Sequence, residues 1–253
     1  MSDYASLADF RERAGYDIDG VWYPRITSIV SIKAKPALYR YYARMPDWRT
    51  ADEAKERSAQ EGTLVHLTVE AILKGMPMEV EEGIRPAVDA FLEFRRHHDI
   101  RPLLIEERVL SREHGYAGTI DILAELDGVV GVLDIKTSKA VYRDYGLQTA
   151  AYMQALSERS DIPPPRTTWV LRLDQSQSCA ICGASMRNKG GNTRVTGGRW
   201  RCQHSWEPMQ GHFELKEVGD FEHNFKAFLG AKTLWDWEYR SYLDRLAGAA
   251  GSR

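Results

Sequence analysis

Two aspartates and a lysine lie close together in the stretch GTIDILAELDGVVGVLDIKTS, residues 118–138. An Asp-Gly dipeptide at its centre favours a two-residue type I′ turn between two strands. In that hairpin, Asp121 lies opposite Asp134, and two facing carboxylates repel each other unless a cation lies between them. Lys136 follows Asp134 by two residues and therefore points to the same face of its strand.

This group of residues suits metal-assisted hydrolysis of a phosphodiester. Converging carboxylates are the hard oxygen ligands that Mg²⁺ and Mn²⁺ prefer, and they leave positions for water and a phosphate. The lysine would orient the attacking water, help to deprotonate it, and stabilise the developing negative charge. The alternative is a solvated hairpin with ordinary surface charges. The apolar run VVGVL before Asp134 favours the metal site, because a charge at the end of a buried strand usually has a partner.

Four short motifs resemble, in order, the metal-binding core of the PD-(D/E)XK nuclease superfamily. GTID at 118–121 and LDIKT at 133–137 resemble its central hairpin. GTLVH at 62–66 resembles the GxxxH helix that precedes the core, and QTAAY at 148–152 resembles the QxxxY helix that follows it. This combination occurs in the branch with the RecB nuclease domain, the CRISPR-adaptation nucleases and many phage exonucleases. The resemblance covers residues 60–156 and implies a restriction-endonuclease-like core.

The resemblance also implies a role for each matching residue. His66, Asp121, Asp134 and the backbone carbonyl of Ile135 would bind the metal ion, which is Mg²⁺ or Mn²⁺. The two aspartates and Lys136 would form the catalytic centre.

Further side chains would complete that centre. The family carries a glutamate on the first strand of the core, as metal ligand and catalytic residue, and LLIEERVL offers Glu106 and Glu107. Glu106 is preferred, because an aliphatic residue follows it three positions later. Gln148 and Tyr152 lie one helical turn apart and would contact DNA or brace the hairpin, although the polar edge of an apolar helical stripe has the same spacing. Thr137 would meet a phosphate.

The three cysteines of the chain lie in one window, CAICGASMRNKGGNTRVTGGRWRCQH. The CxxC pair Cys179 and Cys182, with Cys202 and His204, predicts a closed structural Zn²⁺ site of the Cys₃His type. His212 is the alternative fourth ligand, because CxH is a less usual spacing. Some nucleases of the resembling branch hold an iron–sulfur cluster with four cysteines, but this chain has too few for one.

The same window is rich in positive charge. Between Gln175 and Trp206 it contains five basic residues and no acidic one, whereas the whole chain has a formal net charge of -2. Such a segment would clamp DNA through its phosphates, or it would be a stabilising insertion whose charges face water. The basic residues expected to bind or support DNA are Arg187, Lys189, Arg199 and Arg201.

The remaining sequence predicts the elements that position these residues. Helices are expected at 36–45, 50–73, 84–98, 144–158 and 220–246, and strands at 103–111, 116–126, 129–137, 167–174 and 212–218. Residues 1–35 are expected to be an irregular or short-strand segment. Thr50 and Glu53 predict a capping box at the start of the second helix. This order indicates an α/β or α+β fold, with a mixed central sheet flanked by helices and a small inserted zinc ribbon.

Length and composition set the organisation of the chain. With 253 residues and 28% charged residues, it suits one large globular domain with a small module. The core is expected at 1–175 and 207–247, the zinc module at 176–206 and a disordered tail at 248–253. The absence of an apolar signal segment or a long apolar run predicts a cytoplasmic protein with no membrane contact.

The expected activity is that of a metal-dependent deoxyribonuclease. The resemblance points to an exonuclease on single-stranded or end-bearing DNA in repair, recombination or phage replication, with a helicase or recombinase as a candidate partner. One alternative is a structure-specific endonuclease, and another is a zinc-finger DNA-binding protein without catalysis. The complete set of carboxylates and lysine speaks against the non-catalytic alternative.

Overall fold

The computed structural model describes residues 4–250 of the chain. The helices are α1 (Leu7–Ala14), α2 (Ile26–Ser31), α3 (Pro36–Tyr42), α4 (Trp48–Leu73), α5 (Arg85–His97), α6 (Tyr145–Ser157), α7 (Phe221–Glu238) and α8 (Arg240–Ala250), with a 3₁₀ turn η1 (Glu82–Ile84). The strands are β1 (Gly15–Ile18), β2 (Val21–Pro24), β3 (Ile100–Ser111), β4 (Tyr116–Leu126), β5 (Val129–Lys136), β6 (Thr167–Ser178), β7 (Ser185–Lys189), β8 (Asn192–Thr196) and β9 (Gln210–Glu217).

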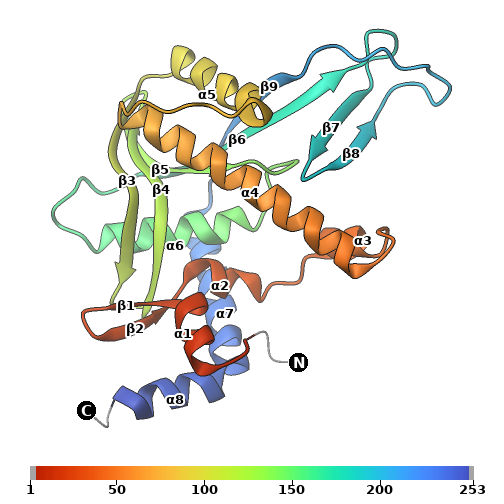
Figure 1. Ribbon diagram of the computed structural model, residues 1–253. Coiled ribbons are helices and arrows are strands. Elements are labelled where there is room, and N and C mark those ends of the chain that lie inside the picture. The colour runs from red at the N-terminus through yellow and green to blue at the C-terminus, as the bar shows by residue number, and fades with distance from the viewer. Residues whose placement is uncertain (1–3, 251–253) are drawn as a thin grey trace.

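A mixed sheet forms the centre of the fold, and helices flank it (Figure 1). Its strand order is β3-β4-β5-β6-β7-β8. In addition, β9 pairs with β6 over residues 169–176 of that strand. The strands β5 and β6 are parallel and are connected through α6, whereas the other neighbours are antiparallel. This arrangement confirms the fold class that the sequence predicts, a mixed central sheet flanked by helices.

Two hydrophobic cores lie on the two sides of the sheet. The first packs α1, α2, α6 and α7 against the sheet, and the second packs α4 and α5 against it. Strand β5 contributes to both by its alternation, because Val132 belongs to the first core while Leu133 and Ile135 belong to the second. The buried strand that VVGVL predicts is therefore present.

The alternation of β4 is interrupted at Asp121. Ile120 belongs to the first core, whereas Ile122, two residues later, belongs to the second. On β3, Glu106 is likewise skipped in the register, between the pairs Ile105–Ile122 and Glu107–Ile120. Its φ of 52° lies in the left-handed region that L-residues rarely adopt. Both strands are thus distorted at the same level of the sheet, next to the predicted metal ligands.

The N-terminal part differs from the sequence expectation. Residues 1–35 were expected to be irregular or in short strands, but the described part contains helices α1 and α2 on either side of a β1–β2 hairpin. The capping box at Thr50 is also wrong. Helix α4 begins at Trp48, and the side chain of Asp47 accepts a hydrogen bond of 2.7 Å from the Thr50 backbone N–H.

The C-terminal part differs in two respects. The single closing helix is divided into α7 and α8 at Tyr239. Helix α8 continues to Ala250, so residues 248–250 are helical rather than disordered, and residues 251–253 lie outside the described residues. Among residues 4–250, no helix combines the length and the apolar character needed to cross a bilayer.

Candidate functional sites

The predicted hairpin is present with its predicted turn. Asp127 and Gly128 have φ values of 50° and 83°, as a type I′ turn requires. Strands β4 and β5 then pair in the expected register for five residue pairs. The pairing ends just before Asp121 and Asp134, where β5 continues its pairing with β6. The two aspartates therefore lie just beyond the last pair between β4 and β5.

Three of the predicted ligands converge at this point. Nitrogen or oxygen atoms of His66, Glu106 and Asp121 all lie within 4.8 Å of one another. His66 Nδ1 is 3.5 Å from Asp121 Oδ1, while Asp121 Oδ2 accepts a hydrogen bond of 2.6 Å from the backbone N–H of Ile135. The expected contribution of the Ile135 carbonyl stays a prediction, because the contact in the structure involves its N–H.

The structure separates the two glutamates of β3. Glu106 is in the group with His66 and Asp121, whereas the carboxylate of Glu107 is 3.6 Å from the guanidinium of Arg159. Burial and then the charge of Asp121 raise the pKa of Glu106. A strained backbone conformation is retained only where the surroundings enforce it, and such positions cluster at binding and catalytic sites. The geometry therefore favours Glu106 over Glu107.

Asp134 and Lys136 form a buried pair beside this group. The Asp134 side chain is completely buried, and neither of its oxygens accepts a hydrogen bond of normal geometry from the described residues. Lys136 Nζ lies 2.6 Å from Asp134 Oδ2, as a close ion pair. Asp134 is not among the three residues whose ligand atoms lie within 4.8 Å of one another.

The charges of this site would suit a bound cation. Burial raises the pKa of Asp134 to about 6, and the charge of Asp121 opposes its ionisation further, although Lys136 favours it. Burial lowers the pKa of Lys136, but the charges of Asp134 and Asp121 raise it more, so that Lys136 is cationic at neutral pH. Burial lowers the pKa of His66, but the contact with Asp121 raises it more, so its protonated form would offset one negative charge. With His66 neutral, three ionised carboxylates and one ammonium leave two negative charges. A divalent cation matches both that charge and the free lone pairs of Asp134.

Two glycines of the motifs allow helices to approach the hairpin. A Cβ on Gly62 would lie 3.0 Å from Thr137 Oγ1, and a Cβ on Gly118 would lie 2.7 Å from the ring of Tyr152. Tyr152 is buried, and Gln148 Nε2 donates to its hydroxyl at 2.9 Å. Of the two roles predicted for Gln148 and Tyr152, the geometry favours bracing the hairpin.

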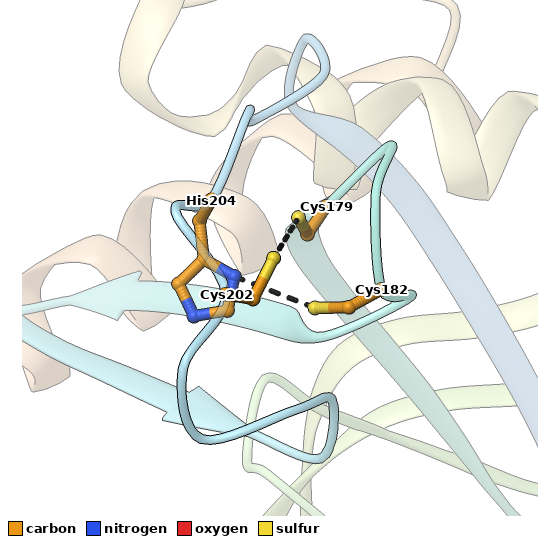
Figure 2. A group of neighbouring side chains, drawn as sticks. All are labelled: Cys179, Cys182, Cys202 and His204. Atoms are coloured by element: carbon orange, nitrogen blue, oxygen red, sulfur yellow. Dashed lines mark hydrogen bonds between the residues drawn. The ribbon is translucent and has the colours of Figure 1, made fainter.

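The cysteine window forms a second group of possible metal ligands (Figure 2). The ligand atoms of Cys179, Cys182, Cys202 and His204 lie within 4.8 Å of one another. The Cys179 and Cys202 sulfurs are 3.9 Å apart, and Cys182 Sγ is 3.5 Å from His204 Nδ1. A tetrahedral site with Zn–S bonds of about 2.3 Å has S···S edges of about 3.8 Å. The four residues could therefore bind a metal ion such as zinc.

The structure also decides between the two candidate histidines. His204 points into the cysteine group, whereas His212 lies on β9 with its Nε2 3.0 Å from Ser176 Oγ. Burial raises the pKa of Cys179, but the contact with His204 and several backbone N–H groups lowers it to about 6. The thiolate, which is the form that binds metal, is therefore favoured at Cys179, whereas burial and the neighbouring cysteines raise the pKa of Cys202 to about 11.

The four predicted basic residues fall into two pairs. Arg187 and Lys189 on β7 turn toward the end of β5, where both donate hydrogen bonds to the carbonyl of Thr137. Arg187 also donates to the carboxylate of Asp174, at 2.7 Å. These two residues therefore hold the Thr137 carbonyl, at the end of β5, from the inserted module.

The other pair lies beside the Cys₃His group. Arg199 and Arg201 are exposed in the loop before His204, and the Arg201 guanidinium lies 4.3 Å from the centre of the exposed Trp200 ring. Their predicted contact with DNA stays a prediction.

One residue of the site carried no sequence signal. The centre of the Tyr145 ring lies 5.2 Å from Lys136 Nζ, although Tyr145 belongs to no motif.

No protein-family model matches the sequence, and no curated protein is significantly similar to it.

Proposed function

We propose that the protein is a divalent-metal-dependent nuclease that hydrolyses phosphodiester bonds of DNA. The observation that carries this proposal is the buried carboxylate of Asp134, which has free oxygen lone pairs and a lysine ammonium at 2.6 Å. It lies beside a converging group of His66, Glu106 and Asp121. A site of this composition suits a hard metal ion and a phosphate.

The residues divide into ligands and a charge-stabilising group. His66, Glu106, Asp121 and Asp134 would hold Mg²⁺ or Mn²⁺, which would act as a Lewis acid and lower the pKa of a bound water. Lys136 is already protonated at neutral pH, so its role is to position the water and stabilise charge on the phosphate rather than to accept a proton. Gln148 and Tyr152 hold the hairpin that carries these groups.

The Cys₃His group supports a structural role for zinc. Its four ligands leave no position for a substrate, as in structural zinc sites. The ion would fix the inserted module and thereby the position of Arg187 and Lys189. Within the proposed activity, we favour an exonuclease on single-stranded or end-bearing DNA over a structure-specific endonuclease.

The test is a cleavage assay on linear and circular single-stranded DNA with Mg²⁺ or Mn²⁺. Asp134→Asn should reduce cleavage by about a hundredfold or more, because a metal ligand and its charge are lost. The matched control is Asp89→Asn, an exposed aspartate on α5. Undiminished cleavage by a folded Asp134→Asn protein would refute the proposed site, and cleavage of circles would show an endonuclease.

A further inference from the structure

A large groove begins beside the catalytic hairpin and is not explained by the metal site. It has a volume of about 1200 Å³ and lies between α3 and the first half of α4 on one side and the β7–β8 hairpin on the other. The segment after β5 forms its floor, including Tyr145. Because the Tyr145 ring lies 5.2 Å from Lys136 Nζ, the groove leads directly to the proposed active site.

The groove is strongly cationic in a chain that is slightly acidic. Ten of its lining residues are lysine or arginine and only two are acidic, whereas the whole chain has a net charge of -2. The two acidic residues are already paired, Asp144 with Lys33 at 2.7 Å and Asp174 with Arg187. The lining residues therefore carry a net positive charge, as expected for a surface that binds a polyanion.

Aromatic rings accompany these charges. Tyr41 lines the α3 side, while Tyr142 and Tyr145 line the floor with ring centres 5.8 Å apart. Tyr142 is 42% exposed. Aromatic rings beside phosphate-binding cations stack on the exposed faces of bases, and a single strand can offer such faces. In a duplex the base faces are covered, so this combination favours a single strand.

The inserted hairpin closes over the groove by packing on α4. Gly190, at the turn between β7 and β8, lies so close to α4 that a Cβ would be 2.2 Å from the Ala54 carbonyl oxygen. Its N–H donates to Glu61 and its carbonyl accepts from Arg57 Nε, at 2.9 and 3.1 Å. The hairpin is thus fixed to α4, on the opposite side of the groove, and Figure 1 shows the β7–β8 turn beside that helix.

We propose that this groove binds single-stranded DNA and guides it to the carboxylates. The guiding of the strand to the carboxylates rests on the proposed nuclease function. Binding by the groove does not depend on cleavage. The α3–α4 wall and the module with the Cys₃His group act together, because each contributes cations to the same strand.

The test removes one charge from each wall. Arg44, after α3, and Arg194, on β8, are exposed, and neither guanidinium makes an ion pair with the described residues. The variant is Arg44→Gln with Arg194→Gln. The matched control is Arg95→Gln with Lys226→Gln, which removes two exposed charges from α5 and α7, outside the groove.

Binding is measured by the fluorescence anisotropy of a labelled oligothymidine in an Asp134→Asn background. The groove variant should bind about tenfold more weakly, and its logarithmic salt dependence should be shallower by about 1.4, since each lost phosphate contact removes about 0.7. The control should bind like the parent, and a duplex of the same length should bind the parent more weakly than the single strand.

The outcomes separate this inference from the proposed function. Equal affinity and salt dependence in the groove variant and the parent would overturn the groove, as would equal losses in variant and control. Equal affinity of the parent for single strand and duplex would overturn the choice of a single strand. Full cleavage by Asp134→Asn in the separate assay would instead overturn the nuclease site and leave the binding result standing.

Discussion

Replacing Gly190 with alanine should detach the β7–β8 hairpin from α4 while the rest of the protein stays folded. Gly190 has a φ of +60°, and its Cβ would be 2.2 Å from the Ala54 carbonyl oxygen and 2.8 Å from the Ser58 backbone nitrogen. Both are backbone atoms of a helix and cannot move independently. The separation must therefore increase by about 1 Å to reach an ordinary contact distance.

The energies favour local detachment over global unfolding. Alanine in the left-handed region costs about 1–2 kcal/mol, and overpacking costs about 1–3 kcal/mol more. The hydrogen bonds of Gly190 to Glu61 and Arg57 hold the hairpin on α4, and a hydrogen bond to a charged group contributes about 1.5–3 kcal/mol. The strain and overpacking energy of the alanine is thus similar in size to the energy of the hydrogen bonds that hold the hairpin on α4. Breaking those hydrogen bonds relieves the clash, and neither hydrophobic core is disturbed.

Gly191→Ala provides the matched control. Gly191 has a φ of +75°, but the nearest atoms to its Cβ are at 3.5 Å or more and belong to the flexible Arg57 side chain. This variant has the backbone strain without the clash. Amide hydrogen exchange should accelerate in β7 and β8 of Gly190→Ala only, and its affinity for single-stranded DNA should fall. Identical exchange and binding in the two variants would refute the reasoning.

Two further predictions concern the inserted module. Cys182→Ser should abolish stoichiometric zinc and lower the thermal unfolding midpoint, because three ligands hold the ion poorly; metal analysis showing unchanged zinc would contradict the closed site. Burial, followed by the charge of Arg187, lowers the pKa of Lys189 from 10.5 to about 8. The unfolded chain therefore binds more protons between these two pH values, and stability from this group should rise as the pH increases through that window. Lys189→Met should flatten the rise in urea-unfolding measurements, and equal slopes in variant and parent would contradict the assignment.

Local sequence was sufficient to predict the hairpin and the Cys₃His group. The turn at Asp127 and Gly128 depends on two neighbouring residues, and it sets the register of β4 and β5. Strand periodicity predicts that Lys136 and Asp134 point to the same face of β5, and the 2.6 Å contact between their side chains confirms it. The CxxC spacing similarly places two ligands on one tight turn.

Other features depended on competition between similar signals. Asp47 and Thr50 are both good N-cap residues, but the Asp47 carboxylate accepts hydrogen bonds from the backbone and the hydroxyl of Thr50. Thr50 is thereby drawn into the first turn, and α4 begins earlier than predicted. The left-handed Glu106 carried no signal, because its conformation arises from the surrounding sheet rather than from its own preference.

The groove was beyond reach of the sequence for a different reason. Residues 39–44, YRYYAR, interleave aromatic and basic side chains, but an amphipathic helix packed on a core has the same pattern. The interpretation of this pattern depends on Lys139, Arg187 and Arg194, which line the same groove. The sheet and the packing of Gly190 on α4 bring these residues close to α3. No local periodicity encodes such long-range proximity.

The docking of Gly190 on α4 also bears on the order of folding. The hydrogen bond between Gly190 and Glu61 spans 129 residues, whereas Cys182 and His204 are only 22 residues apart. Contacts that close short loops form faster than those that close long ones. During synthesis, α4 and the carboxylate-bearing strands leave the ribosome before the inserted module. The groove between α4 and that module should therefore be among the last features to form.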